Sequence, residues 1–209
     1  MSRYRSMRSV ITALLLATLP LLQAADEGFR ARSAPDYAAK QKQHQFTVAV
    51  MPYHREADAK NAFGKVKPFK YGVLPVLVVI TNDSDDALSL EKLQVRFIEV
   101  GREGLEPIPA DDLAYVKASS KPKERPAYIP RLPGLGKPKV KKGPLADEVI
   151  LQRAFNAPIV APHSSASGFF FYLTGSDPDP VPGSQMYISG LRNLTSGEEL
   201  FYFEIPLDR

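Results

Sequence analysis

The run from Val73 to Thr81 is the feature that most restricts how this 209-residue chain can fold. Its residues are apolar up to the closing threonine, and most of them are β-branched, which is typical of a strand. A strand with one wet face alternates apolar and polar residues, whereas this run is apolar on both faces and must be covered on both. Pro75 has no N–H to donate, so it should lie near the start of the strand or at a bulge. We therefore expect a central strand between two packed layers.

Further strands are predicted on either side of this run. Phe46–Met51 alternates and is rich in β-branched residues, and Leu88–Val100 follows a turn at Asn82–Asp86. Asn and Asp favour such a turn because their side chains bond to nearby backbone groups and tolerate a left-handed backbone. Three more strands are expected at 166–173, 185–189 and 199–205, short helices at 110–117 and 144–155, and a short helix or an irregular connection at 54–63.

Two aromatic runs, Phe169–Tyr172 and Phe201–Phe203, place rings on both faces of their strands. A two-layer sandwich buries only the facing sides of its two sheets. The outer faces of these strands must therefore be covered by another part of the chain. The predicted helices and the long middle segment are the parts available for this.

Three segments resemble those of exported bacterial immunoglobulin-like proteins, including telokin-like ones, of uncharacterised function. Pro75–Asp85 is similar to their apolar strand that ends in Asn and a small polar turn. Pro162–Tyr172 is similar to the Pro-Gly-x-x-x-x-Gly-aromatic pattern at the start of one of their strands, with His163 in place of the first glycine. Tyr187–Leu207 resembles their closing hairpin. The resemblance implies a β-sandwich, but it implies no activity and no site.

The expected fold is accordingly a mainly β, immunoglobulin-like antiparallel β-sandwich. It has one or two short helical insertions and a long Pro/Lys-rich crossover. No repeat of 20–50 residues is visible, which excludes solenoids and propellers.

The first 24 residues carry the pattern of a Sec-type signal peptide. Three arginines precede an uncharged apolar run, Val10–Leu22, and small residues follow it. A membrane anchor is the alternative, but a spanning helix needs roughly 20 apolar residues and this run is shorter and contains a proline. We expect an exported bacterial protein, periplasmic or extracellular, with a loose leader at 25–44 and a single domain at 45–209.

The sequence contains no motif that identifies a catalytic or metal site. It has no cysteine, which excludes disulfides, thiolate metal sites and a cysteine nucleophile. Gly-x-Ser-x-Gly and His-Glu-x-x-His patterns are missing as well, so no catalytic residue, metal site or cofactor is predicted. Surface or loop positions are expected for His44, His54 and His163. One cation hypothesis is that Asp83–Asp86 and Asp177–Asp179 meet at one end of the sandwich, and a solvated turn is the alternative.

The segment 117–142 differs from the rest of the chain. It carries nine Lys and Arg against one Glu, and five prolines that favour an extended path. Loops of this length without secondary structure are usually functional or disordered. A solvated loop tacked onto the sandwich is one interpretation, and an arm that faces an anionic partner is the other. The residues predicted to make that contact are Lys121, Lys123, Arg125, Arg131, Lys137, Lys139, Lys141 and Lys142.

These observations favour an exported, non-enzymatic binding or interaction module of the cell envelope. Its partner would be an anionic envelope polymer, an acidic lipid headgroup or an acidic protein. Without the signal peptide and the basic segment, the remaining body carries 15 Lys and Arg against 22 Asp and Glu, so the charge is separated along the chain. Nucleic acid is not expected as a partner, because export separates the protein from its cell's own pool. The alternatives are a carboxylate-dependent enzyme acting on envelope carbohydrate and a purely structural accessory protein.

Overall fold

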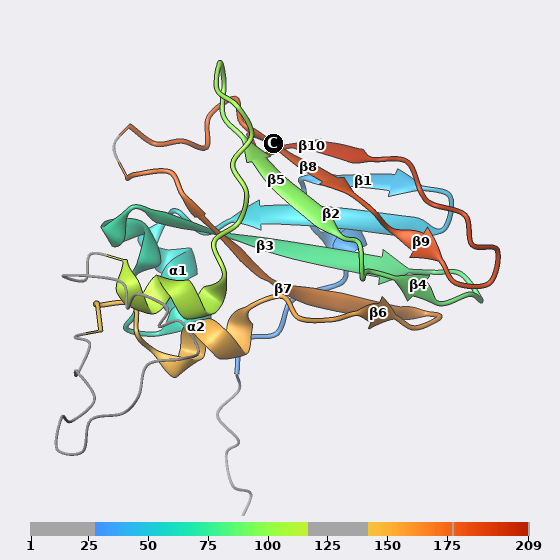
Figure 1. Ribbon diagram of the computed structural model, residues 1–209, viewed down its shortest axis with the longest axis horizontal. Coiled ribbons are helices and arrows are strands. Elements are labelled where there is room, and N and C mark those ends of the chain that lie inside the picture. The colour runs from blue at the N-terminus through green and yellow to red at the C-terminus, as the bar shows by residue number, and fades with distance from the viewer. Residues whose placement is uncertain (1–27, 117–141, 177, 209) are drawn as a thin grey trace, which may run out of the picture.

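The computed structural model describes residues 28–116, 142–176 and 178–208 (Figure 1). The strands are β1 (Lys40–Gln43), β2 (Phe46–Pro52), β3 (Val73–Asn82), β4 (Leu88–Ser89), β5 (Gln94–Ile98), β6 (Ile159–Val160), β7 (Ser164–Leu173), β8 (Gln185–Ser189), β9 (Arg192–Asn193) and β10 (Phe203–Pro206). The α-helices are α1 (Glu56–Phe63) and α2 (Glu148–Arg153), and the 3-10 helices are η1 (Ala34–Asp36), η2 (Pro68–Tyr71) and η3 (Ala110–Tyr115). The helices predicted at 110–117 and 144–155 are thus present but shorter than expected, the first of them as a 3-10 helix, and of the two alternatives for 54–63 the helix is present.

The strands form antiparallel sheets that pack as a sandwich. The larger sheet has the order β1-β2-β3-β7, the facing sheet has the order β10-β8-β5, and a small sheet has the order β6-β4-β9. Every pair of neighbouring strands is antiparallel. The mainly β, antiparallel sandwich with a few short helices is therefore confirmed.

Strand β3 lies inside the larger sheet, as its apolar run predicts. It pairs with β2 on one side and with all of β7 on the other, and all ten of its residues are buried. Pro75 is its third residue, near the start as expected. The carbonyl oxygen of Pro75 accepts a hydrogen bond from the backbone N–H of Tyr53 at 2.8 Å. The strand has a packed layer on each face, described next.

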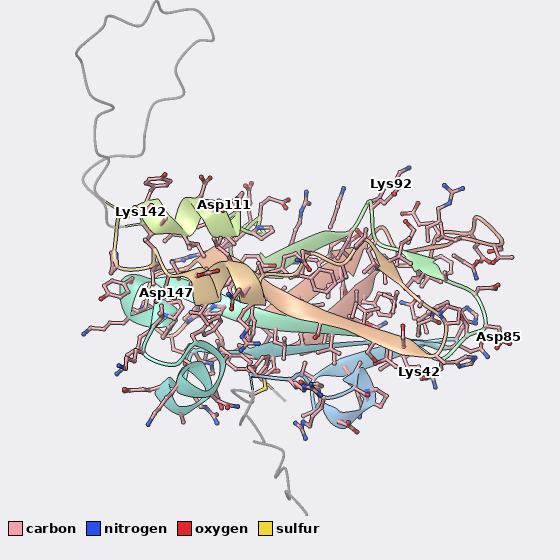
Figure 2. The ribbon with its side chains drawn as sticks, turned by 90° about the horizontal axis from the view of Figure 1, so that it is seen from below. Lys42, Asp85, Lys92, Asp111, Lys142 and Asp147 are labelled. Carbon is pink, nitrogen blue, oxygen red and sulfur yellow. The ribbon has the colours of Figure 1, made fainter. Side chains whose placement is uncertain are left out.

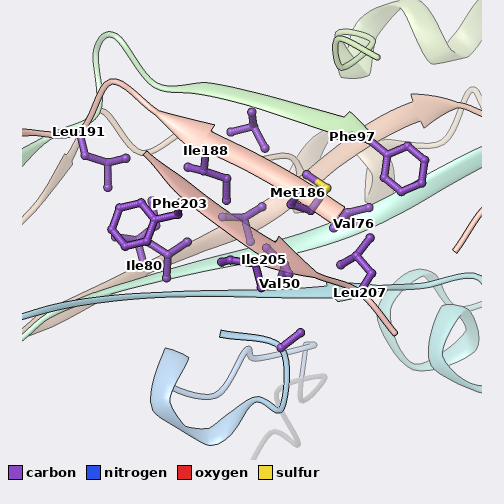
Figure 3. Packing of buried hydrophobic residues seen from close by; sticks show 14 of the residues in the cluster. Val50, Val76, Ile80, Phe97, Met186, Ile188, Leu191, Phe203, Ile205 and Leu207 are labelled. Atoms are coloured by element: carbon purple, nitrogen blue, oxygen red, sulfur yellow. The ribbon is translucent and has the colours of Figure 1, made fainter. Parts of the chain in front are cut away.

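An inner core fills the space between the two large sheets. Val76 and Ile80 enter it from β3, while Met186 and Phe203 enter it from β8 and β10 (Figure 3). The small sheet closes one end of this core with Leu88, which is fully buried. Because burying a side chain of this size contributes roughly 1.5–3 kcal/mol, packing can hold the domain together without disulfides.

An outer core covers the opposite face of the larger sheet. Leu77 and Phe169 project into it from β3 and β7. The helices supply Phe63 from α1, Leu113 from η3 and Ile150 from α2, each at most 1% exposed. Figure 1 shows α1 and α2 together at one end of the sandwich. The prediction that helices cover this second face is therefore confirmed.

The two aromatic runs behave differently. The rings of the first run are divided between the inner and outer cores, as expected. In the second run only Phe203 is buried, whereas Phe201 is 79% exposed and Tyr202 is 52% exposed. The expectation that both faces of that strand are covered is wrong, because the outer core lies on the larger sheet and not on this one. Tyr202 instead stacks on Tyr187, with ring centroids 5.4 Å apart.

The expected loose leader is wrong for residues 34–43, which belong to the folded unit. Ala34 is fully buried, and its N–H donates to the hydroxyl of Thr81 at 2.9 Å. Tyr37 is also buried, and β1 pairs with β2 along its length. The sequence shows no apolar pattern here because β1 reads Lys-Gln-Lys-Gln and lies at the edge of the sheet.

Two glutamines of β1 connect the larger sheet to β10 of the facing sheet. The backbone N–H of Glu204 donates to Oε1 of Gln41 at 2.9 Å. Nε2 of Gln43 donates to the carbonyl oxygen of Tyr202 at 2.8 Å. The two side chains therefore bond to the backbone of β10 and of the residue just before it, and they hold the edge strand β1 against the facing sheet.

Asn82 holds together the predicted turn after β3. Its side chain is fully buried, and its Oδ1 accepts bonds from the N–H and hydroxyl of Ser84 at 2.9 and 2.6 Å. Its Nδ2 lies 2.7 Å from the carbonyl oxygen of Asp86, 3.2 Å from that of Ala161 and 3.3 Å from that of Val160. One amide thus ties the turn to the segment after β6.

We predict that Asn82→Ala lowers the free energy of unfolding by about 2–4 kcal/mol, because it leaves buried donors and acceptors without partners. Denaturant unfolding monitored by circular dichroism measures this loss. Asp83→Ala is the matched control, since Asp83 is exposed and makes only a 3.9 Å ion pair with Lys42. An equal loss in both variants would show that the Asn82 network is not stabilising.

Candidate functional site

The basic segment is the site predicted from the sequence, and most of it lies outside the described residues. The predicted contact residues outside the described ranges are Lys121, Lys123, Arg125, Arg131, Lys137, Lys139 and Lys141. Lys142 is described and exposed. Figure 2 shows Lys142 at the opposite end of the molecule from Lys42 and Asp85.

The two ends of the segment are fastened side by side. The N–H of Gly143 donates to the carbonyl oxygen of Ala114 at 2.6 Å, just outside the two ends. Both ends belong to the helical layer, because η3 precedes the segment and α2 follows it. The chain has already passed from β5 to the larger sheet before η3, where Ile108 pairs with Phe171. The described residues on either side of the segment therefore belong to the same layer, and the predicted Pro/Lys-rich crossover itself lies outside the described residues.

The residues that flank the basic segment are packed firmly into the domain. Leu113 before it and Leu145 after it are at most 1% exposed in the outer core. Asp147 caps the start of α2, and its Oδ1 accepts from the N–H of Val149 at 3.0 Å. Asp111, Asp147 and Glu148, in the elements on either side of the segment, are exposed, and Figure 2 places Asp111 and Asp147 at the same end as Lys142. The basic segment is thus flanked on both sides by acidic residues of the domain.

The hypothesis of a cation shared by two acidic loops is wrong. In the β3–β7 pairing, Val73 lies opposite Leu173 and Asn82 lies opposite Ser164. The turn at 83–87 and the loop after β7 are therefore at opposite ends of paired strands that are roughly 30 Å long. No three His, Asp or Glu side chains in the described ranges are grouped so as to hold a metal ion.

All three histidines lie in loops or turns; His44 and His163 are exposed, and His54 is partly buried. His163 has φ +51°, and its Nε2 lies 2.9 Å from Oδ1 of Asp85. His44 is exposed in the β1–β2 turn with φ +50°. His54 is only 17% exposed, and its Nε2 lies 3.7 Å from Asp179. These pairs join neighbouring loops and do not resemble a catalytic arrangement.

The carboxyl group of Asp86 and two tyrosine hydroxyls have a shifted pKa. Hydrogen bonds from Thr195 and Asn193 lower the pKa of Asp86, which keeps this carboxylate ionised in the turn beside β9. Burial raises the pKa of Tyr53 and of Tyr172, so both phenols stay neutral. Tyr172 donates its hydroxyl proton to the carbonyl oxygen of Val95 at 3.2 Å. All of these groups serve the fold.

A cavity of about 330 Å³ next to the end of α2 is a candidate that the sequence did not predict. It is lined by Phe29, Arg30, Ala31, Leu77, Gln152, Arg153, Ala154, Asn156, Ser167, Gly168 and Phe169. These residues come from segments more than a hundred positions apart, so no local motif could have revealed it. A smaller cavity of about 210 Å³, lined mostly by proline and aromatic residues, also borders Ala154 and Phe169.

Comparison with known proteins provides a fold likeness only. No family model matches the chain, and no curated protein matches it. A functionally unknown protein from Listeria monocytogenes EGD-e is similar in structure, with a TM-score of 0.37 and 11% identity over 80% of both chains. A conserved hypothetical protein from Bacillus anthracis has a TM-score of 0.34 and 10% identity over 80% of this chain and 91% of its own. Neither α1 nor α2, nor any other helix in the described ranges, has the length and hydrophobicity needed to span a bilayer.

Proposed function

We propose that this protein is an exported, non-enzymatic binding or interaction module of the cell envelope, and that segment 117–142 contacts an anionic partner. The observation that carries this proposal is the bond between Gly143 and Ala114, which fixes both ends of the segment at one place. A net charge of +8 is therefore attached to the domain at a single point. Concentrated positive charge of this kind attracts polyanions and increases their association rate.

The acidic residues that flank the segment support the competing structural role. Asp111, Asp147 and Glu148 could pair with cations of the segment and hold it on its own domain. These three carboxylates carry less charge than the net +8 of the segment, which supports the binding role, while the 22 Asp and Glu of the body as a whole are the groups that a structural role would use.

We also propose that the sandwich is immunoglobulin-like in topology. The order β10-β8-β5 corresponds to strands G, F and C of that fold, and β2-β3-β7 corresponds to strands A, B and E. Strand β1 would then be an added edge strand. This agreement in order and direction supports the assignment independently of the sequence resemblance.

We predict that neutralising four lysines of the segment weakens retention in the envelope fraction and reduces its dependence on salt. The variant carries Lys→Gln at Lys137, Lys139, Lys141 and Lys142. Fewer ionic contacts mean weaker binding at low salt and a smaller further loss at high salt, where exposed charges are screened. Fractionation of cells followed by washes of increasing salt measures both effects.

The control changes four exposed lysines on the body of the protein, Lys60, Lys65, Lys70 and Lys92, to Gln. This control alters the net charge by the same amount and leaves the segment intact. The proposal predicts retention close to wild type for the control. Equal loss in both variants, or full retention of the segment variant at low salt, would contradict it.

A further inference from the structure

The cavity beside α2 is built from three parts of the fold. The N-terminal Phe29–Ala31 forms one wall, and residues 152–156 at the end of α2 form another. Ser167–Phe169 of β7 and Leu77 of β3 complete it. Strands β3 and β7 and helix α2 thus supply one side of the cavity, and irregular segments supply the rest.

Gly168 sets the position of the wall that follows α2. A Cβ at this residue would lie 2.4 Å from Cα of Phe155, so only glycine lets the two chains approach so closely. The N–H of Phe155 donates to the carbonyl oxygen of Phe169 at 3.1 Å, and Ala154 bridges to the same residue. The cavity is therefore preformed by backbone contacts.

Arg153 is the charged group held at this wall. Its Nη1 donates to the carbonyl oxygen of Phe29 at 2.9 Å, and its guanidinium carbon lies 5.5 Å from the centre of the Phe29 ring. These two contacts fix the guanidinium plane before any ligand arrives. Its Nε is buried and has no hydrogen-bond acceptor among the described residues. Because protein atoms cover Nε, a molecule in the cavity would pair with the terminal nitrogens of the guanidinium and not with Nε.

The cavity also lacks a countercharge within the described residues. Arg153 forms no ion pair there, and the lining contains no Asp or Glu. Arg30 adds a second, exposed cation, while Gln152, Asn156 and Ser167 add neutral polar groups. A partly buried guanidinium without a carboxylate partner is free to pair with an anionic group that enters the cavity.

We propose that this cavity is a binding site for a small ligand that carries an oxyanion, a carboxylate or a phosphate, which pairs with Arg153. The planar guanidinium matches two oxygens of either group. A volume of about 330 Å³ lies at the lower end of ligand sites, which selects a small molecule or the end of a larger one. The inference does not depend on the basic segment, because none of the lining residues belongs to it.

The test uses two charged probes and their neutral counterparts with the purified protein. N-acetylglycine is compared with N-acetylglycinamide, and glycerol phosphate with glycerol, by titration followed with NMR shifts of backbone amides. We expect one charged probe to shift the amides of Asn156 and Ser167–Phe169, and its neutral counterpart to have no effect. The probe that binds identifies the source of the oxyanion.

Two variants locate the binding. Arg153→Gln should weaken binding of the charged probe by roughly tenfold or more, since it removes a charge-assisted pair. Ser167→Leu keeps the arginine but fills the cavity, and it should weaken binding of the probe as well. Arg55→Gln is the matched control, because Arg55 is exposed and lies at the start of α1. The proposal is overturned if neither charged probe binds more tightly than its neutral form, or if Arg153→Gln and Ser167→Leu both bind like Arg55→Gln.

Discussion

Replacing Phe169 with alanine is expected to lower the free energy of unfolding by about 3–5 kcal/mol, among the largest effects of any single side chain. Phe169 is 1% exposed at the centre of the outer core. Its ring centroid lies 4.7 Å from that of Phe63, 4.8 Å from that of Tyr53 and 5.5 Å from that of Phe29. These rings come from three other segments and could not all move in to fill the space.

Denaturant unfolding measures this loss, and Phe201→Ala is its matched control. Phe201 has the same side chain but is 79% exposed, so its loss should be within about 0.5 kcal/mol. A small effect at both positions would show that the helical layer does not form a true core on the larger sheet.

Gly190→Ala is expected to destabilise the protein by about 2–5 kcal/mol, from a strained backbone and a steric clash together. Gly190 has φ +80° in the connection between β8 and β9. A Cβ there would lie 2.0 Å from the carbonyl oxygen of Lys92, which is backbone and cannot swing aside. The tight packing of this connection against the start of β5 would have to open.

Gly64→Ala separates the two causes of that loss. Gly64 also has positive φ, +61°, but no atom lies within 4 Å of a Cβ built there. It should therefore show only the backbone cost, about 1–3 kcal/mol. If thermal unfolding places the two variants at the same stability, the close approach of Lys92 is not part of the native state.

The sequence predicted the strands whose buried faces show an apolar pattern. The apolar run of β3 required a layer on each face, and both cores are present. Edge strand β1 was missed because its exposed Lys and Gln residues carry no apolar signal, and it is held by pairing and by side-chain bonds to β10. The exposure of Phe201 was missed for the converse reason, since an aromatic ring by itself does not reveal which face is covered.

Site residues were less predictable because they depend on tertiary proximity. Charge counting identified the basic segment, but it could not reveal that Gly143 and Ala114 join its two ends. The residues around Arg153 come from both ends of the chain and meet only once β7 lies beside α2. Sequence alone also suggested a cation shared by two acidic loops, and the antiparallel register of β3 and β7 separates these loops.

The central claim is that the domain folds independently of the basic segment and uses it for binding. Excision of residues 117–141, with a short Gly/Ser linker in their place, tests this claim most directly. Because Gly143 and Ala114 are already bonded, closing the shorter loop should cost little, and the thermal midpoint should stay within a few degrees of wild type. The account predicts a folded protein that no longer remains with the envelope fraction at low salt. A folded excision variant retained as well as wild type would contradict it.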